Sequence, residues 1–153
     1  MPIIGIKEIS FVIILLAFAS VQSVELTEDL LFYYQTQKYD AKAIVFTKQQ
    51  NIKIGISSDT DVIDFGQIYE NMSSRKYINV TGNKYDYKVK VYVSGNISEF
   101  VNIEKNNFIL EKNQATAIPI LFSGNKPGNY NGEVKVVFKR VKYPIFNWLL
   151  KCV

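Results

Sequence analysis

The chain contains no histidine and only one cysteine, Cys152, among its 153 residues. Without histidine, a Ser-His-Asp triad, a Cys-His dyad and a histidine-ligated zinc site are all excluded. Because Cys152 has no partner in its own chain, no internal disulfide can form, even in an oxidising compartment. The stability of the fold must therefore come from packing.

Long apolar runs are also scarce, and the longest lies near the N-terminus, from Phe11 to Ala19. It follows Lys7 and precedes small residues, so residues 1–23 are predicted to be a secretory signal peptide, cleaved after Ala19 or, as we prefer, after Ser23. The run is about half of the roughly 20 apolar residues that a spanning helix needs, and retention as an uncleaved anchor is the alternative. In both cases we expect an extracellular or envelope protein.

The composition favours one folded domain. Hydrophobic residues make up 48% of the chain and charged residues 21%, which is enough apolar surface to bury a core. Ten tyrosines and ten phenylalanines favour strands. The net charge is +4, but the lysines are dispersed, so we expect no nucleic-acid binding. A weak affinity for acidic surfaces such as glycans remains open.

Apolar and polar residues alternate along most of the chain, which is the period of strands. Short strands about ten residues apart, with turn residues between them and no long helix, predict an all-β fold, a single antiparallel β-sandwich of seven or more strands. Within it, Pro119 predicts an edge position or a bulge, because proline cannot donate to a ladder. The predicted strands are 41–47, 51–57, 62–65, 76–81, 86–93, 100–103, 108–110, 116–122 and 132–141.

The lead-in segment, residues 24–50, is ambiguous before residue 40. Thr27 could begin a short helix, whereas the run Leu-Leu-Phe-Tyr-Tyr at residues 30–34 is equally consistent with a buried strand. We favour a short helix or irregular structure there. A strand follows at 41–47.

Several stretches resemble one family. They are Asp64-Phe-Gly-Gln-Ile68, Lys76-Tyr-Ile-Asn-Val80, Val101-Asn-Ile103, Phe108-Ile-Leu110 and Pro127-Gly-Asn-Tyr-Asn-Gly-Glu-Val134. Together they resemble the immunoglobulin-like sandwiches of archaeal and bacterial cell-surface proteins and, more distantly, PapD-like pilus chaperones and archaellum stator proteins. The resemblance covers residues 51–142 and implies architecture only. It also implies a further strand after residue 142, where only an apolar C-terminal tail, residues 143–153, remains.

The stretch around Tyr130 predicts a corner of the fold. Gly128 and Gly132 are expected to supply permissive backbone angles where the chain turns between sheets. Tyr130 is expected to bury its ring and hydrogen-bond nearby backbone, as in the tyrosine corner of such sandwiches.

Acidic residues offer weak candidates for a site. Asp59, Asp61 and Asp64 could supply oxygen ligands to calcium, but the loop lacks the glycine and glutamate of an EF-hand, and solvated turn residues are the favoured interpretation. Paired carboxylates for glycoside hydrolysis would have to come from residues beside turns, and surface acids are again favoured. These residues are Glu99, Glu104 and Glu111. We therefore predict no catalytic residue, no cofactor and no metal, and hence no enzyme.

Two groups of residues are candidates for sites on the protein surface. Asn71, Asn79 and Asn96 begin Asn-X-Ser/Thr sequons, candidate glycosylation sites in an exported chain. The tail carries a dense apolar cluster. We expect it to pair as the missing final strand or to pack over an open end of the sandwich, and the alternative is a docking patch for another subunit or a membrane. The patch residues are Ile145, Phe146, Trp148 and Leu149.

These observations predict an exported, non-catalytic structural or binding module that contacts envelope or surface proteins, with glycan as another candidate partner and membrane contact only through an uncleaved N-terminus. The first alternative is a pilus-like filament subunit that assembles by strand donation, because the strand at 41–47 precedes the sandwich and the last strand is missing. The second alternative is an exported chaperone-like or stator-like binding module.

Overall fold

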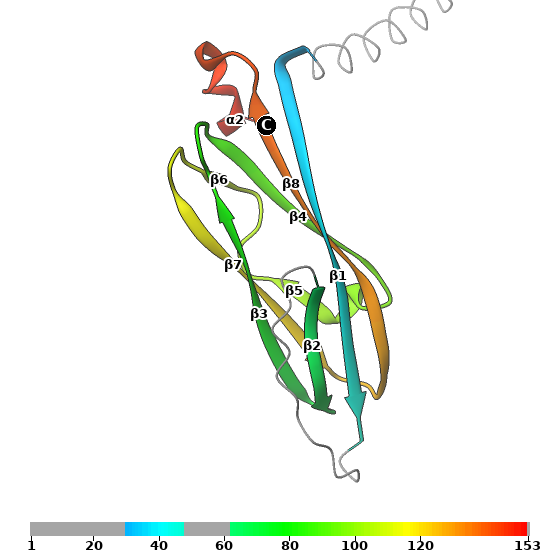
Figure 1. The fold of residues 1–153 in the computed structure, drawn as a ribbon. Coiled ribbons are helices and arrows are strands. Elements are labelled where there is room, and N and C mark those ends of the chain that lie inside the picture. The colour runs from blue at the N-terminus through cyan, green and yellow to red at the C-terminus, as the bar shows by residue number, and fades with distance from the viewer. Residues whose placement is uncertain (1–29, 48–61, 153) are drawn as a thin grey trace, which may run out of the picture.

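The computed structural model describes residues 30–47 and 62–152, which form eight strands in two sheets (Figure 1). The predicted all-β, two-sheet body is thereby confirmed, whereas the signal segment 1–23 and the strand expected at 51–57 lie outside the described residues. The strands are β1 (Phe32–Phe46), β2 (Val62–Tyr69), β3 (Met72–Thr81), β4 (Tyr87–Gly95), β5 (Val101–Ile103), β6 (Phe108–Leu110), β7 (Ala115–Gly124) and β8 (Gly128–Val141). The helical turns are η1 (Ser98–Phe100), η2 (Pro144–Phe146) and α2 (Leu149–Cys152).

One sheet has the strand order β2-β1-β8-β4-β6 and the other has the order β3-β7-β5. Neighbouring strands are antiparallel except β1 and β2, which are parallel, with Asp40 opposite Val62 and Phe46 opposite Tyr69. The expectation of a purely antiparallel sandwich was therefore wrong for this pair. Strand β2 begins opposite Asp40, near the middle of β1, and then runs in the same direction as β1.

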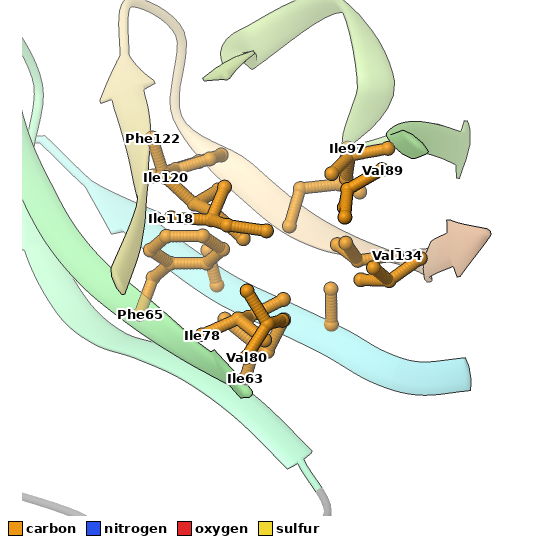
Figure 2. Close-up of a cluster of buried hydrophobic side chains, with 14 of the residues drawn as sticks. Ile63, Phe65, Ile78, Val80, Val89, Ile97, Ile118, Ile120, Phe122 and Val134 are labelled. Carbon is orange, nitrogen blue, oxygen red and sulfur yellow. The ribbon is translucent and has the colours of Figure 1, made fainter. Parts of the chain in front are cut away.

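The two sheets pack through one apolar core (Figure 2). Ile118, Ile120 and Phe122 of β7 are fully buried and lie opposite side chains of the five-stranded sheet such as Val134. The ring of Phe65 meets that of Phe122 at 5.3 Å between centroids. Alternating β-branched and aromatic residues thus fill the space between the sheets, as the period of two predicted.

Strand β1 is the main departure from the sequence-based expectation. Only Leu30 and Leu31 are helical, and the chain is extended from Phe32 onward. The helix favoured for this segment was wrong, because β8 provides a partner along the whole length of β1, with Phe32 opposite Val141 and Val45 opposite Gly128. A long antiparallel partner outweighs the weak local preference.

Pro119 also departs from the expectation of an edge position or a bulge, because β7 is the central strand of its sheet and its register with β3 runs through Pro119 without a shift. The carbonyl of Pro119 accepts a hydrogen bond from Glu104, the residue that follows β5, at 3.2 Å. In a strand, the N–H and C=O of one residue point to the same side, so the missing N–H of Pro119 faces the place where β5 has just ended. No ladder bond of β5 is lost there.

Beyond β6, the far edge of β4 is covered by a side chain. The amide of Asn106 accepts a hydrogen bond from the N–H of Val91 at 2.8 Å and donates one to its carbonyl at 3.0 Å. Asn106 therefore occupies the position that a neighbouring strand would take.

After β8, the described residues 142–152 form no further strand. Instead η2 and α2 fold against the end of the five-stranded sheet, next to the start of β1 (Figure 1). There Phe32, Val141 and Leu150 form a second buried cluster, separate from the main core. None of the helices within residues 30–47 and 62–152 is long and apolar enough to cross a bilayer.

Candidate functional site

Strand β1 has two halves that differ in their partners. The core half, Asp40–Phe46, lies between β2 and β8 and hydrogen-bonds to both. The edge half, Phe32–Tyr39, pairs with β8 on one side, and no other strand in the described ranges pairs with its second side. An exposed row of backbone donors and acceptors is a template for pairing with a further strand.

The core half is fixed by burial. Ala41, Ala43 and Val45 point into the main core, and each is only 2% exposed. Ala43 lies directly opposite Tyr130 on β8. Both residues belong to the main core, so a larger side chain at Ala43 would displace packed neighbours.

The edge half is fixed by cations stacked on rings. The Arg140 guanidinium lies 4.7 Å from the Tyr33 ring centroid and 4.3 Å from that of Tyr85. The Lys139 ammonium lies 3.9 Å from the Phe32 ring centroid. Such contacts contribute about 0.5–1 kcal/mol each at exposed sites such as Tyr33 and Tyr85, whereas the Phe32 ring is buried in the second cluster.

Two hollows flank the edge half, one on each face of its sheet. On the face toward the three-stranded sheet, a space of about 280 Å³ is lined mainly by polar groups, among them Gln35 and Gln37 of β1 and Asn79 of β3. On the outer face, a space of about 400 Å³ lies over β1, β8, β4 and the turn before β6. The outer hollow is lined by Tyr34, Lys88, Lys90, Tyr92, Asn107, Val137 and Lys139.

The Tyr130 corner has a packing role in the structure. The Tyr130 ring packs 4.5 Å from the Phe100 ring, and its hydroxyl donates to the carbonyl of Lys126 at 2.8 Å. Gly128 has a left-handed φ of 155°. Gly132 serves a different purpose from the expected one, since a Cβ there would collide with the backbone oxygen of Ser94 on β4. Gly132 therefore permits close approach of β4 and β8.

Asp64, one of the three candidate calcium ligands, is engaged within the fold. One carboxylate oxygen accepts a hydrogen bond from the Gly66 N–H at 2.8 Å, and the other lies 3.2 Å from the ammonium of Lys42. These contacts hold a bulge at which β2 gains one residue relative to β1. Asp59 and Asp61 lie outside the described residues.

The three candidate glutamates belong to separate elements. Glu99 lies in η1, Glu104 follows β5 and pairs with Arg75 at 2.6 Å, and Glu111 follows β6. Across the part of the chain that the structure describes, no group of three or more acidic or sulfur-bearing residues could hold a metal ion. The structure thus does not bring the candidate carboxylates together into a site.

The three sequon asparagines are all exposed, but their surroundings differ. Asn71 lies at the turn between β2 and β3, with a φ of 66°, and Asn79 lies on β3. The side chain of Asn96 accepts a hydrogen bond from the Asn131 N–H at 2.7 Å and donates one to the carbonyl of Asn129. The amide of Asn96 therefore joins the β4–η1 turn to β8.

The apolar patch of the tail is divided between core and solvent. Phe146 and Leu149 pack on the second cluster, whereas Ile145 is 79% exposed and Trp148 61% exposed. The first two residues thus cover the start of β1, and only the last two present apolar surface.

No family model, no curated protein and no solved structure matches this chain. Its function must therefore be argued from its own geometry. The feature that sequence reasoning missed is the position of β1 beside β8, together with the basic residues that stack on its rings. The pairing of Tyr33 with Arg140 on neighbouring strands could not be predicted from the sequence, because the two residues are more than a hundred positions apart and meet only through the strand register.

Proposed function

We propose that this protein is an exported, non-catalytic subunit of a cell-surface assembly, and that neighbouring copies join by exchanging strand β1. The observation that carries the proposal is the place of β1 between β2 and β8 (Figure 1). A strand from the start of the described chain completes a sheet whose other members all come after residue 61.

An immunoglobulin-like interpretation of the strand order supports this. In such sandwiches the next-to-last strand pairs with the last strand of the chain. We interpret β8 as the next-to-last strand, because the chain leaves the sheet after Val141 and forms helical turns. Strand β1 then takes the place of the last strand, antiparallel to β8 along fourteen residue pairs.

The contacts of β1 are the same whether it comes from its own chain or from a neighbour, and exchange of an identical element is a low-cost route to assembly. Removing β1 without replacement would uncover the core at Val134 and Tyr130 and leave β8 with one unpaired side. We therefore expect the position beside β8 to be occupied at all times, by β1 of the same chain or by β1 of a neighbouring copy.

The chain that joins β1 to β2 is long enough for exchange. It comprises the fourteen residues 48–61, and within one copy it must span the distance from Thr47 back to Val62. Since Val62 lies level with Asp40, that distance is about seven residues of strand, roughly 23 Å. Fourteen residues can extend to roughly 48 Å, so the link has ample length to carry β1 to an adjacent copy.

Cysteine pairs across β1 and β8 test the exchange. In a Cys152→Ser background, Thr36→Cys and Val137→Cys place two thiols on directly opposite residues, a spacing suited to a disulfide. In protein isolated from its cells, we expect oxidation to give a ladder of covalent multimers on non-reducing gels. A matched pair, Ser73→Cys with Ser123→Cys on β3 and β7, should give only monomers.

The proposal fails if the Thr36–Val137 pair also closes only within single chains at every protein concentration. A second candidate would then be favoured, an exported binding module that adds an extended segment of another protein to the edge half of β1 by β-augmentation. This candidate is supported by the pairing of the described strands, none of which pairs with the second side of that half.

A further inference from the structure

The tail that follows β8 is a run of helical turns with apolar side chains on two sides. Backbone hydrogen bonds between residues three positions apart run through it, and side chains with that spacing lie on one side of such turns. Phe146 and Leu149 have this spacing and pack on the second cluster. Ile145 and Trp148 have it too, and both are exposed. The outward side of the tail therefore presents apolar surface to water.

Two further exposed side chains, those of Leu30 and Tyr143, belong to the same end of the molecule. Leu30 precedes Leu31, whose carbonyl accepts a hydrogen bond from the Lys142 N–H at 2.8 Å, so the start of the described chain meets the tail there (Figure 1). Exposed apolar residues that gather in this way mark sites of contact with a partner or a membrane. We call this group the end patch, and its members are Leu30, Tyr143, Ile145 and Trp148.

Basic residues surround the end patch. Lys84 and Lys112 line a hollow of about 260 Å³ together with Asn147 of the tail, and Lys151 is exposed further along the tail. We call these three lysines the basic rim. One carboxylate at this end, that of Asp86, already accepts a hydrogen bond from the Lys112 N–H at 2.8 Å. Five basic and two acidic residues occupy the described segments of this end, which are 30–33, 82–86, 109–114 and 140–152.

We propose that this end of the molecule lies against a membrane surface that carries anionic lipids, with the end patch between the headgroups and the acyl chains. Tryptophan and tyrosine favour that depth, because each has an apolar ring with a polar group at its edge. Ile145 and Leu30 add aliphatic surface, and the ammonium groups of the basic rim attract the lipid phosphates. A second copy of this chain is a poorer occupant, because it would bring the same positive charge to the contact.

The N-terminal sequence supports a membrane as the occupant. The described chain begins at Leu30, within the end patch, and only residues 20–29 separate it from the apolar run that ends at Ala19. Ten residues extend to at most roughly 35 Å, so while that run is in a bilayer this end of the molecule stays near the membrane. The inference goes beyond strand exchange and does not depend on it, since the tail residues of the end patch come from one chain whichever copy supplies β1.

Trp148 is the only tryptophan in the chain, so tryptophan fluorescence reports on this end alone. The test mixes the protein, as exported by its cells, with vesicles of equal parts phosphatidylcholine and phosphatidylglycerol that carry a nitroxide quencher just below the headgroups. We expect the Trp148 emission to shift to shorter wavelength and to be quenched. Vesicles of phosphatidylcholine alone, or high salt, should reduce the quenching at least twofold, because the anionic charge is then absent or screened.

Two variants keep the reporter in place. Tyr143→Ser/Ile145→Ser should lower the quenching at least threefold with an unchanged melting temperature, and Lys112→Gln/Lys151→Gln should lower it only with the anionic vesicles. A matched control, Met72→Ser/Tyr77→Ser, removes one aliphatic and one tyrosine side chain from exposed positions of β3 and should behave as the wild type does.

Absent quenching, equal quenching by both kinds of vesicle, or an equal loss in the control variant would each overturn the proposal. So would an emission shift that grows with protein concentration in the absence of vesicles, since a second copy of the chain would then cover the end patch.

Discussion

The two halves of β1 belong to one strand and share one partner, β8, but they are held by different forces. The core half lies between β2 and β8, and the apolar side chains of its inward face are buried in the main core. The edge half is held by arginine and lysine stacked on its rings and by the small cluster around Phe32. The comparison teaches that a strand can be tightly fixed at one end and weakly fixed at the other, which is the property that an exchanging element needs.

The largest difference between the two halves of β1 is expected when a charged side chain is introduced into each of them. Ala43→Asp puts a carboxyl group into the core opposite Tyr130, and we expect it to lower the free energy of unfolding by about 4 kcal/mol or more. Thr36→Asp in the edge half should change it by no more than about 0.5 kcal/mol, because Thr36 is exposed. Urea unfolding followed by tyrosine and tryptophan fluorescence measures both. Similar losses for the two variants would show that the halves are equally fixed.

Truncation of Phe32 tests whether the second cluster acts locally. Phe32→Ala removes a ring that is 6% exposed, at a cost of about 3 kcal/mol to that cluster. Since the cluster is separate from the main core, hydrogen exchange should accelerate along the edge half and in α2, while the amides of Val89 and Val136 stay protected. Faster exchange at Val89 as well would mean that the strand unfolds as one unit with the core.

The smallest expected difference between the halves is in the coupling energies of their two ion pairs. Lys38 pairs with Glu133 in the edge half at 3.3 Å, and Lys42 pairs with Asp64 in the core half at 3.2 Å. Because Glu133 is more exposed than Asp64, a double-mutant cycle should give roughly 0.3 kcal/mol for the first pair and up to about 1 kcal/mol for the second, both reduced by salt. Equal coupling energies would remove this electrostatic contrast between the halves.

The sequence predicted much of the body and little of β1. The alternation of Val89, Val91 and Val93 with lysines predicted the bounds of β4 to within two residues, because one face of that strand is apolar and the other is charged. The edge half of β1 has polar side chains on both faces, so no period distinguishes it, and its extended form depends on β8. Its parallel pairing with β2 depends on long-range order that no local pattern carries.

The candidate sites divide in the same way. The packing of Tyr130 and its hydrogen bond to Lys126 depend on neighbours within a few positions, and local motifs pointed to them. The outer hollow joins Tyr34, Lys90 and Lys139, which meet only when three strands from distant parts of the chain are in register. Spacing along the sequence could not bring these side chains together.

Asn106 has a consequence for growth of the sheet. Its amide occupies the far side of β4 at Val91, whereas along the edge half of β1 no strand of the described residues lies on the side away from β8. Addition of another strand beside β4 is thereby blocked at Val91. Side-chain hydrogen bonds can thus cover a strand border without a neighbouring strand, which protects that border from pairing with another chain.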